Sequence, residues 1–408
     1  MRDDIQPSTK HIPLRIALFV LALAVAVSSI SYGVTRIGRQ NIGYSAVDPD
    51  TDEEAPRYAV GVVLTYYFEG SPNSMREEKN LLRTAYGSAL RSAYKQLDAV
   101  NCYEGVTNLA SLNRNRGQTL EVSAELYAVL RDAYEKTLER RSYSVFAGAL
   151  YAEWNSILPL EEPEDFDPLR NEDEARRLEQ IAAANAELSA FSLEFLDDER
   201  HLLRFSVSNA YQTMLQELEI DAPVLDLNLL REAYELELVA RALEAEGYTR
   251  GYLSTDSGLT LALSGQDSGR FALYGEIEGK PVCAAEIAVT PGSACSMFHS
   301  FAFAEDEACF YVLDGHKRHP YVPADGRYRE LLASSCVCNA EGALVEACYR
   351  NILLQSCADA AQLERTAAEG GMLAAWTLQG DGEKIVYTVG SGEIEAASDY
   401  GFSLSAIS

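Results

Sequence analysis

The first long apolar stretch of the chain predicts a segment that can enter a membrane. Apolar residues fill 16–30, and the run continues with small polar interruptions to 34. A helix rises 1.5 Å per residue, so about 20 residues cross a hydrocarbon layer roughly 30 Å thick. We therefore expect 12–34 to be a transmembrane anchor. A cleaved signal peptide is the alternative, because small residues end the run.

The charges around this stretch predict its orientation. Lys10 and Arg15 precede it, whereas Arg36 and Arg39 follow it and weaken the asymmetry. Positive residues favour the cytoplasmic side of a membrane. We expect 1–11 to be a cytoplasmic N-terminus and the bulk of the chain to lie outside the cytoplasm, at the cell membrane.

The next segment is polar and acidic. Between 48 and 54 the sequence reads Asp-Pro-Asp-Thr-Asp-Glu-Glu. Like charges and low hydrophobicity disfavour a packed core, so 35–57 is predicted to be a solvated linker.

Beyond the linker, strand and helix periods alternate. Residues 58–68 are rich in β-branched and aromatic residues and predict a strand. Leu82, Tyr86 and Leu90 belong to a helical stripe within 74–100. A loop is expected to end at Asn113, and Ser123 can cap a second helix that reaches about residue 140.

The remaining pattern predicts more short strands between helices. We expect a polar helix near 172–190, paired strands at 191–195 and 202–207, an extended 224–227, a helix at 229–246, short strands over 250–303, a helix at 341–357 and a final helix–strand pair. No Pro/Gly-rich linker interrupts them. The sequence therefore predicts one α+β domain over 58–408, behind the N-terminal transmembrane helix.

Charge excludes one class of function. Lys and Arg number 34 against 62 Asp and Glu, a net charge of −28. Sequence-independent binding of nucleic acid needs a basic surface. No nucleic-acid partner is therefore expected.

Cysteine and histidine patterns leave other chemistry open. Seven of the eight cysteines fall between Cys283 and Cys357. Outside the cytoplasm they can form disulfides, and small buried hydrophobes are the alternative. Cys336 and Cys338 lack the C-x-x-C spacing of a zinc site. The chain has no H-E-x-x-H, GxSxG or P-loop motif, so hydrolase and nucleoside-triphosphatase functions lack support.

Four segments in the same order resemble the FAD:protein FMN transferase (ApbE-like) family. The first, 108–113 (NLASLN), is similar to E-I-S-R-L-N, and the second, 143–154, shares Gly148, Leu150 and Trp154 with F-D-P-T-V-G-P-L-x-x-L-W. The third, 226–234 (DLNLLREAY), is similar to D-L-G-G-I-A-K-G-Y. The fourth, 319–326, shares its His, Pro and Gly with H-I-I-D-P-x-T-G. The resemblance covers roughly 58–395.

The resemblance implies cofactors, a partner and site residues. Members of the family cleave FAD with Mg²⁺ and attach FMN to a Ser or Thr of a partner protein, here an extracytoplasmic flavin acceptor. It implies Asp226 as the catalytic residue and Glu346 as the metal ligand. The implied cofactor-binding residues are Asn113, Asn228, Glu232, Lys317, His319 and Gly326.

The chain also departs from the family pattern. Asn228 and Leu229 stand where the family has two glycines, whose backbone can approach a nucleotide closely. Glu232 replaces a lysine. Gly342 and Glu346 replace the Asp and Thr of a metal site, which needs several oxygens around a hard cation.

Several of these residues have ordinary structural alternatives. Asp226 can cap the helix that follows it. His319 can lie in an exposed turn, or Lys317 and Arg318 beside it can attract an anion. Glu346 can be a solvated acid. Two functions follow: a membrane-anchored FMN transferase, or a degenerate, non-catalytic family member that acts as a cell-surface binding module.

Overall fold

The computed structural model describes residues 43–50, 61–139, 142–266, 269–278, 280–290, 292–300, 311–313, 316–318, 326–327, 329–379 and 384–407. The segments expected to be a cytoplasmic N-terminus, 1–11, and an anchor, 12–34, lie outside them. Within the described residues, no helix has the length and apolar character needed to cross a membrane.

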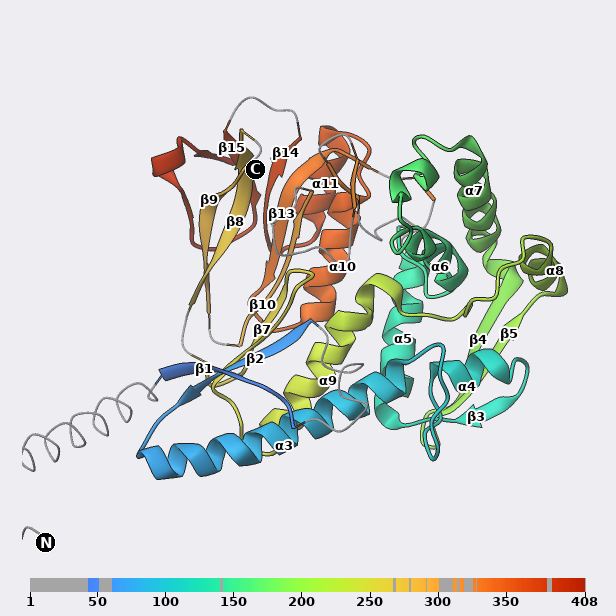
Figure 1. The fold of residues 1–408 in the computed structure, drawn as a ribbon, viewed down its shortest axis with the longest axis horizontal. Coiled ribbons are helices and arrows are strands. Elements are labelled where there is room, and N and C mark those ends of the chain that lie inside the picture. Colours follow the sequence, from blue (N-terminus) through green and yellow to red (C-terminus); the bar gives the residue numbers. More distant parts are fainter. Residues whose placement is uncertain are drawn as a thin grey trace, which may run out of the picture.

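A large mixed sheet forms one half of the molecule (Figure 1). Its nine strands lie in the order β1 (Gly43–Val47), β2 (Val62–Phe68), β6 (Gly251–Thr255), β7 (Leu259–Ala262), β10 (Ala294–His299), β13 (Leu332–Asn339), β14 (Leu373–Leu378), β15 (Ile385–Val389) and β17 (Ser403–Ala406). Neighbouring strands are antiparallel except for the parallel pair β15–β17.

Each face of this sheet is covered by a different layer. Helices pack on one face: α3 (Pro72–Leu97), α9 (Arg231–Ala245), α10 (Leu344–Gln355) and α11 (Ala360–Glu369). A three-stranded sheet packs on the other: β8 (Gly269–Ile277), β9 (Lys280–Val289) and β16 (Ile394–Ala396). The strands in the middle are therefore buried on both faces, and all but one residue of β13 is buried.

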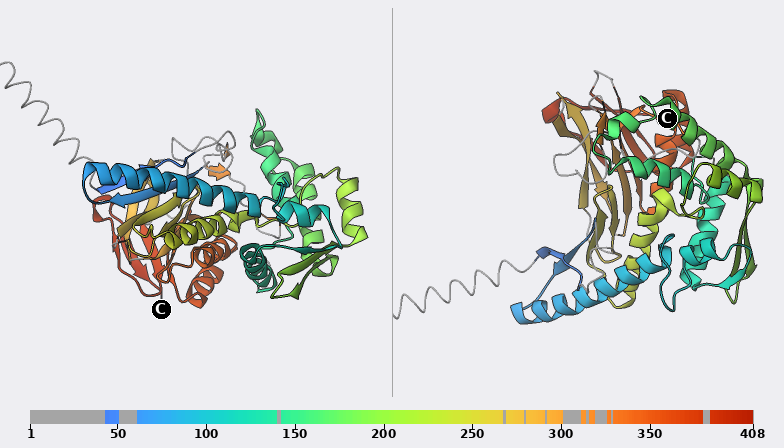
Figure 2. Two further views of the ribbon diagram at one scale, coloured as in Figure 1. Left: turned by 90° about the horizontal axis from the view of Figure 1, so that it is seen from below. Right: turned by 45° about the vertical axis from the view of Figure 1, so that its right-hand side comes forward.

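The other half of the molecule is mostly helical, and it lies beside the sheet half in all three views (Figures 1 and 2). It contains α4 (Leu109–Arg114), α5 (Ala124–Glu139), α6 (Gly148–Ile157), α7 (Glu172–Ala186), α8 (Asn209–Glu217) and the small antiparallel sheet of β3 (Thr119–Glu121), β5 (Leu202–Val207) and β4 (Phe191–Asp197). One apolar core runs through both halves. The short hairpin of β11 (Tyr311–Leu313) and β12 (His316–Arg318) completes the described strands.

Most predicted elements are present. The predicted helical stripe is α3, where Leu82 and Tyr86 are fully buried. Ser123 caps α5 by accepting a hydrogen bond from Leu126 N–H at 3.1 Å. The predicted paired strands are β4 and β5.

Two predictions are wrong. The linker expected over 35–57 contains β1, which pairs with β2, buries Val47 and continues into Asp50, whose N–H donates to Arg83 O on α3. The loop expected before Asn113 is helix α4, which begins with a capping box formed by Asn108 and Ser111. In both segments the polar composition predicted a loop, whereas the backbone forms the hydrogen bonds of a strand or a helix.

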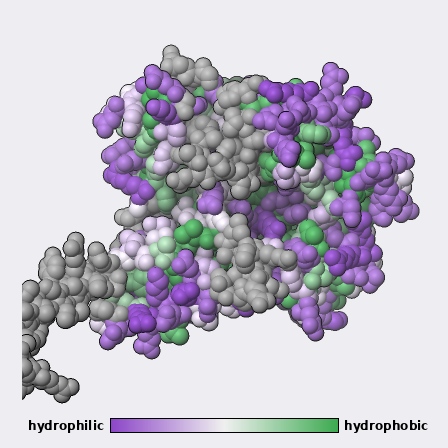
Figure 3. Space-filling model, in the orientation of Figure 1, coloured by the Kyte–Doolittle hydropathy of each residue, from purple (hydrophilic) through white to green (hydrophobic). Residues whose placement is uncertain are grey.

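Hydrophobic residues form small, separate patches on the face shown in Figure 3, between larger hydrophilic areas. A polar surface of this kind agrees with the excess of acidic residues.

Candidate functional site

Two segments of the resemblance lie against each other at the start of α9. Asp226 N–H donates to Val145 O at 2.9 Å, and Gly148 N–H donates to Val224 O at 3.2 Å. A Cβ on Gly148 would lie 2.3 Å from Pro223 O, so this approach requires glycine. The first turn of α6 is thereby fixed against the segment that holds Asp226.

Asn113 positions the same segment. Its side-chain oxygen accepts hydrogen bonds from Val224 N–H and Leu225 N–H at 3.2 and 3.0 Å, and its amide nitrogen donates to Leu225 O at 2.8 Å and Ala99 O at 3.4 Å. The amide is buried and both its ends are engaged by the backbone. The structure therefore uses Asn113, implied as a cofactor ligand, to hold the chain before α9.

Asp226 and Asn228 form a tight turn. Asp226 Oδ1 accepts a hydrogen bond from Asn228 N–H at 2.9 Å, and Asn228 has a φ of +48°. Burial raises the pKa of Asp226 above its usual value, against the hydrogen bond from Asn228 and the nearby Arg231 guanidinium. Asp226 does not cap α9, which begins at Arg231 without a side-chain cap.

The amide of Asn228 ties this turn to the neighbouring segment. Its nitrogen donates to Ser144 O at 3.1 Å and to Asp226 O at 2.9 Å, and its side-chain oxygen is buried without a hydrogen bond. Asn228, at the position of the first family glycine, thus has a left-handed conformation, and asparagine is one of the residues that tolerate it.

Two charged residues on α9, Arg231 and Glu235, were not predicted from the sequence to be site residues. The Arg231 guanidinium lies over the Tyr94 ring at 5.0 Å. Burial alone lowers the pKa of Arg231, but Glu235 and Asp226 outweigh it and raise the pKa. Burial raises the pKa of Glu235 to about 7, against the attraction of Arg231. A carboxyl that titrates near neutrality is typical of functional sites, and the i, i+4 spacing of the pair was the available signal.

Glu232 faces another part of the chain. It is exposed on α9 and accepts a hydrogen bond from Ser257 Oγ, in the turn between β6 and β7. This acid therefore contributes negative charge at the position where the family has a lysine.

The Glu346 carboxylate is paired with two cations. Its Oε2 lies 3.0 Å from Lys136 Nζ, and its Oε1 accepts from Arg350 Nε at 2.8 Å. Lys136 Nζ also lies 3.0 Å from Asp132 Oδ1, so this ammonium sits between two carboxylates. Burial alone would raise the pKa of Glu346, but Lys136 and Arg350 hold it below the usual value.

Buried tyrosines connect this ion-pair network to the turn before α9. Tyr143 OH donates to Leu227 O at 3.1 Å, and its ring packs against that of Tyr349 at 6.3 Å. Tyr349 OH donates to Lys136 O at 3.2 Å, and Tyr234 OH donates to Asp132. The residues implied as catalytic and metal-binding thus belong to one contiguous, partly buried region.

Phe146 fills space beside this region. Its ring stacks on Phe191 at 4.7 Å and on Phe205 at 6.1 Å, and its side chain is fully buried. The family has the threonine of F-D-P-T at this position. A hydroxyl-bearing side chain is therefore replaced by an aromatic ring that packs in the core.

Of the last segment of the resemblance, only Gly326 is among the described residues. Gly326 has a φ of +73°, and a Cβ there would lie 2.8 Å from the Ala182 side chain on α7. Gly326 is therefore fitted against a helix of the other half. The backbone of Lys317 lies in β12, and His319 is outside the described residues.

The expectation that Arg318 attracts an external anion is wrong. Its Nε and NH2 lie 2.7 and 3.0 Å from the two oxygens of Asp167, and both side chains are buried. The guanidinium also lies over the Trp154 ring at 5.6 Å. This bidentate pair joins the β11–β12 hairpin to the helical half.

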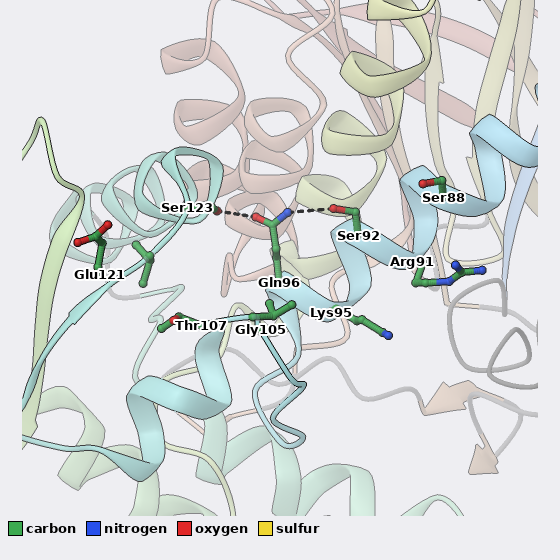
Figure 4. Close-up of a pocket in the computed structure, with 11 residues that line it drawn as sticks. Ser88, Arg91, Ser92, Lys95, Gln96, Gly105, Thr107, Glu121 and Ser123 are labelled. Carbon is green, nitrogen blue, oxygen red and sulfur yellow. Dashed lines mark hydrogen bonds between the residues drawn. The ribbon is translucent and has the colours of Figure 1, made fainter.

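A cavity of about 670 Å³ lies between the C-terminal half of α3 and the loops before α4 and α5 (Figure 4). Ser123 Oγ donates to Gln96 Oε1 at 2.7 Å, and Gln96 Nε2 donates to Ser92 Oγ at 3.2 Å. Arg91 and Lys95 also line it. Its volume lies within the roughly 300–1,000 Å³ of small-molecule sites, and its lining suits a polar ligand.

The residues present do not fit the divalent cation that the resemblance implies. A Cβ at Gly342 would lie 2.3 Å from Gly292 O, and Gly342 has a φ of +80°, so no acidic side chain can stand there. Both oxygens of Glu346 are paired with cations. No three acidic side chains of the described residues converge on one point.

The surroundings of the turn before α9 also oppose a polyanion. Asp226, Glu232 and Glu235 all lie within ten residues of one another on α9 or just before it. Arg231 is the nearby cation, and a pyrophosphate would compete for it with Glu235 and Asp226, whose charges act on its guanidinium. This charge pattern does not fit the FAD that the resemblance implies.

Comparison with known proteins connects this chain to one group of structures. No protein-family model matches the sequence, and no curated protein matches it. The fold matches the ApbE protein of Thermotoga maritima with a TM-score of 0.56 at 12% identity, covering 88% of this chain and 98% of that one. It matches the flavinyl transferase ApbE of Pseudomonas stutzeri with a TM-score of 0.53 at 14% identity, covering 82% and 91%. The resemblance seen in the sequence is therefore confirmed at the level of the fold.

Proposed function

We propose that this chain is a binding protein built on a flavin-transferase-like scaffold, without metal-dependent transfer of FMN. The N-terminal segment 12–34 holds it at the membrane, and the folded part lies outside the cytoplasm. The fold supports the scaffold, and the apolar run supports the anchor.

One observation carries the non-catalytic part of the proposal. The Lys136 ammonium lies between Asp132 and Glu346, beside the position that the resemblance gives to a metal ligand. A divalent cation at Glu346 would have to displace Lys136 or Arg350 from the carboxylate. Lys136 is thus a cation held by two carboxylates at the place where the resemblance implies Mg²⁺.

The alternative is transfer of FMN from FAD to a Ser or Thr of an extracytoplasmic partner, which the resemblance implies. Charge that develops on a pyrophosphate needs cationic stabilisation. Gly342, Glu346 and Glu232 replace the groups that would supply a metal site and a lysine. The polar cavity on α3 is instead a place where a small ligand can bind without a metal.

The direct test is incubation of the purified full-length protein with FAD and Mg²⁺. We expect no AMP by chromatography, and calorimetry should show no FAD binding that depends on Mg²⁺. The Pseudomonas stutzeri flavinyl transferase serves as a parallel sample under the same conditions. Release of AMP, or Mg²⁺-dependent binding of FAD, would overturn the proposal.

A second experiment tests the cation held by Asp132 and Glu346. The Lys136→Met variant keeps most of the apolar stem but leaves Asp132 and Glu346 without the ammonium. We expect Mg²⁺ to raise the melting temperature of this variant and to leave the unsubstituted protein unchanged. At 100 times its dissociation constant a ligand stabilises by about 2.7 kcal/mol. Arg176→Met, in an exposed pair on α7, is the matched control and should not respond.

A further inference from the structure

Four sulfur side chains occupy adjacent positions on two paired strands. In the antiparallel pair β10–β13, Cys295 lies opposite Cys338 and Met297 lies opposite Cys336. Residues two apart on a strand point to the same face. All four side chains therefore share the face of the large sheet that is covered by β8, β9 and β16, and they pack in one cluster there.

We propose that these four residues, the sulfur square, bind one soft metal ion, with Cu(I) as the ion whose chemistry they fit. The three thiol sulfurs all lie within 4.8 Å of one another, and those of Cys336 and Cys338 are 3.5 Å apart. With metal–sulfur bonds of about 2.3 Å, a trigonal site places its sulfurs about 4.0 Å apart. The Cys336–Cys338 separation of 3.5 Å is slightly below that value and no pair of the three thiols exceeds 4.8 Å, so small side-chain rotations suffice to close the site.

The surroundings favour a soft ion over a hard one. Ala285, Leu273 and Phe402 belong to the apolar cluster that encloses the square. Within the described residues, no histidine or carboxylate joins the three thiols to form a larger group. Thiolate and thioether sulfurs select Cu(I), whereas carboxylates and water suit Mg²⁺. The square is thus unsuited to the hard cation of the flavin transferases and offers a separate chemistry.

The protons and charges of such a site balance with Cu(I). Thiols bind metals as thiolates, so binding releases protons. Loss of two protons to Cu(I) leaves a site with a net charge of −1, and the third thiol and the Met297 thioether act as neutral ligands. A low net charge limits the cost of burying the site in an apolar layer.

Packing alone is a weaker explanation of the square. Buried cysteine often serves as a small hydrophobe, as Cys357 does between α10 and α11. However, the chain has 8 cysteines and 5 methionines among 408 residues, and four of these 13 meet at two register pairs on one face of the strand pair, with Ser296 opposite Val337 between them. Alanine stands at other positions that face the same cluster, Ala375 on the neighbouring strand β14 and Ala285 on β9 in the covering sheet.

The test is a Cu(I) titration of the full-length protein, reduced and handled without oxygen, against the competing chelator bicinchoninate. Cys102, which is exposed, is replaced by serine in every protein used. We expect one tightly held equivalent of Cu(I) in the parent protein. The X-ray absorption spectrum should show a shell of sulfur neighbours without nitrogen or oxygen.

Two variants locate the ion. Replacing Cys336 and Cys338 with serine should weaken binding by more than the roughly 10–100-fold that loss of an outer-shell partner costs. Cys357→Ser, an equally buried cysteine in another core, should keep the equivalent. Near-ultraviolet circular dichroism checks that each variant is folded. The proposal is overturned if the folded parent protein holds no Cu(I), if the double variant keeps it, or if Zn(II) displaces it.

Discussion

At the residue scale, the departures from the family pattern are built into the structure rather than left as gaps. Asn228 keeps the left-handed turn and ties it to Ser144, and Phe146 joins a stack of buried rings. Glu346 has a cation at each oxygen. Each of these substituted residues therefore has partners within the chain.

Glu346 gives a prediction about pH. A carboxyl whose folded pKa is lowered stabilises the protein above its unfolded pKa, about 4.3 for Glu, and this contribution is lost as the pH falls through the folded pKa. We expect Glu346→Gln to lower the free energy of unfolding by about 1–3 kcal/mol at pH 7, as loss of a charged hydrogen bond does. Urea unfolding at pH 7, 5 and 3.5 should show this difference shrinking below about pH 4.

Glu364→Gln is the control for this series, because Glu364 is exposed on α11. Its effect should be small at every pH. A loss in Glu346→Gln that stays constant from pH 7 to pH 3.5 would show that packing, rather than the ion pairs with Lys136 and Arg350, explains it.

The candidate site was only partly accessible from the sequence at this scale. The D-L-x-x spacing pointed to Asp226 and Asn228, which lie in one turn. The partners of these residues are distant in the chain: Lys136 and Glu346 are 210 positions apart, and Arg318 and Asp167 are 151 apart. A single sequence carries no signal for such pairs, so the sequence left open whether Arg318 attracts an anion.

At the scale of elements, the sequence predicted those whose own periodicity is strong. Helix α3 has a continuous apolar stripe, and β4 and β5 flank a polar turn. Strand β1 is an edge strand whose pairing depends on β2, and α4 is one short helix set by its cap. Near the C-terminus, the sequence predicted a single strand where the structure has β14 to β17. The strands within 385–407 depend on pairing with other strands, which a local pattern does not show.

The buried pair between Arg318 and Asp167 yields a prediction about how elements are joined. Removing one partner of a buried ion pair costs about 3–5 kcal/mol, because the other charge stays buried alone. We expect Arg318→Met and Asp167→Leu each to lose that much in urea unfolding. The double variant should lose much less free energy of unfolding than the sum of the two single losses. The difference is the coupling energy of the pair, which joins the hairpin to the helical half.

An exposed pair provides the comparison for this cycle. Arg200 and Glu121 lie 3.1 Å apart with side chains 65% and 63% exposed. Arg200→Met should cost less than about 1 kcal/mol, as exposed pairs generally contribute little. Additive losses in the Arg318–Asp167 cycle would contradict a bridging role for that pair.

At the scale of the whole molecule, the net charge and the fold together restrict the possible classes of function. The mixed helix and strand architecture is that of the ApbE structures, whereas the net charge of −28 opposes both nucleic acid and a polyanionic cofactor. Residues 1–40 carry five basic and two acidic residues, so the acid belongs to the rest of the chain. This division is what a near-neutral anchor and an acidic external domain would show.

The anchor can be tested on the whole protein in cells. Each Asp at the centre of a membrane helix costs about 2.5–3.5 kcal/mol of insertion free energy. We therefore expect Leu21→Asp with Val25→Asp to release the protein from membranes that are washed with alkaline carbonate. Thr35→Asp with Gln40→Asp, beyond the apolar run, should leave it bound. The mass of the mature protein then distinguishes a retained anchor from a cleaved signal peptide. An intact N-terminus identifies an anchor. Loss of the first 24 to 30 residues identifies a cleaved signal peptide and contradicts membrane anchoring by 12–34.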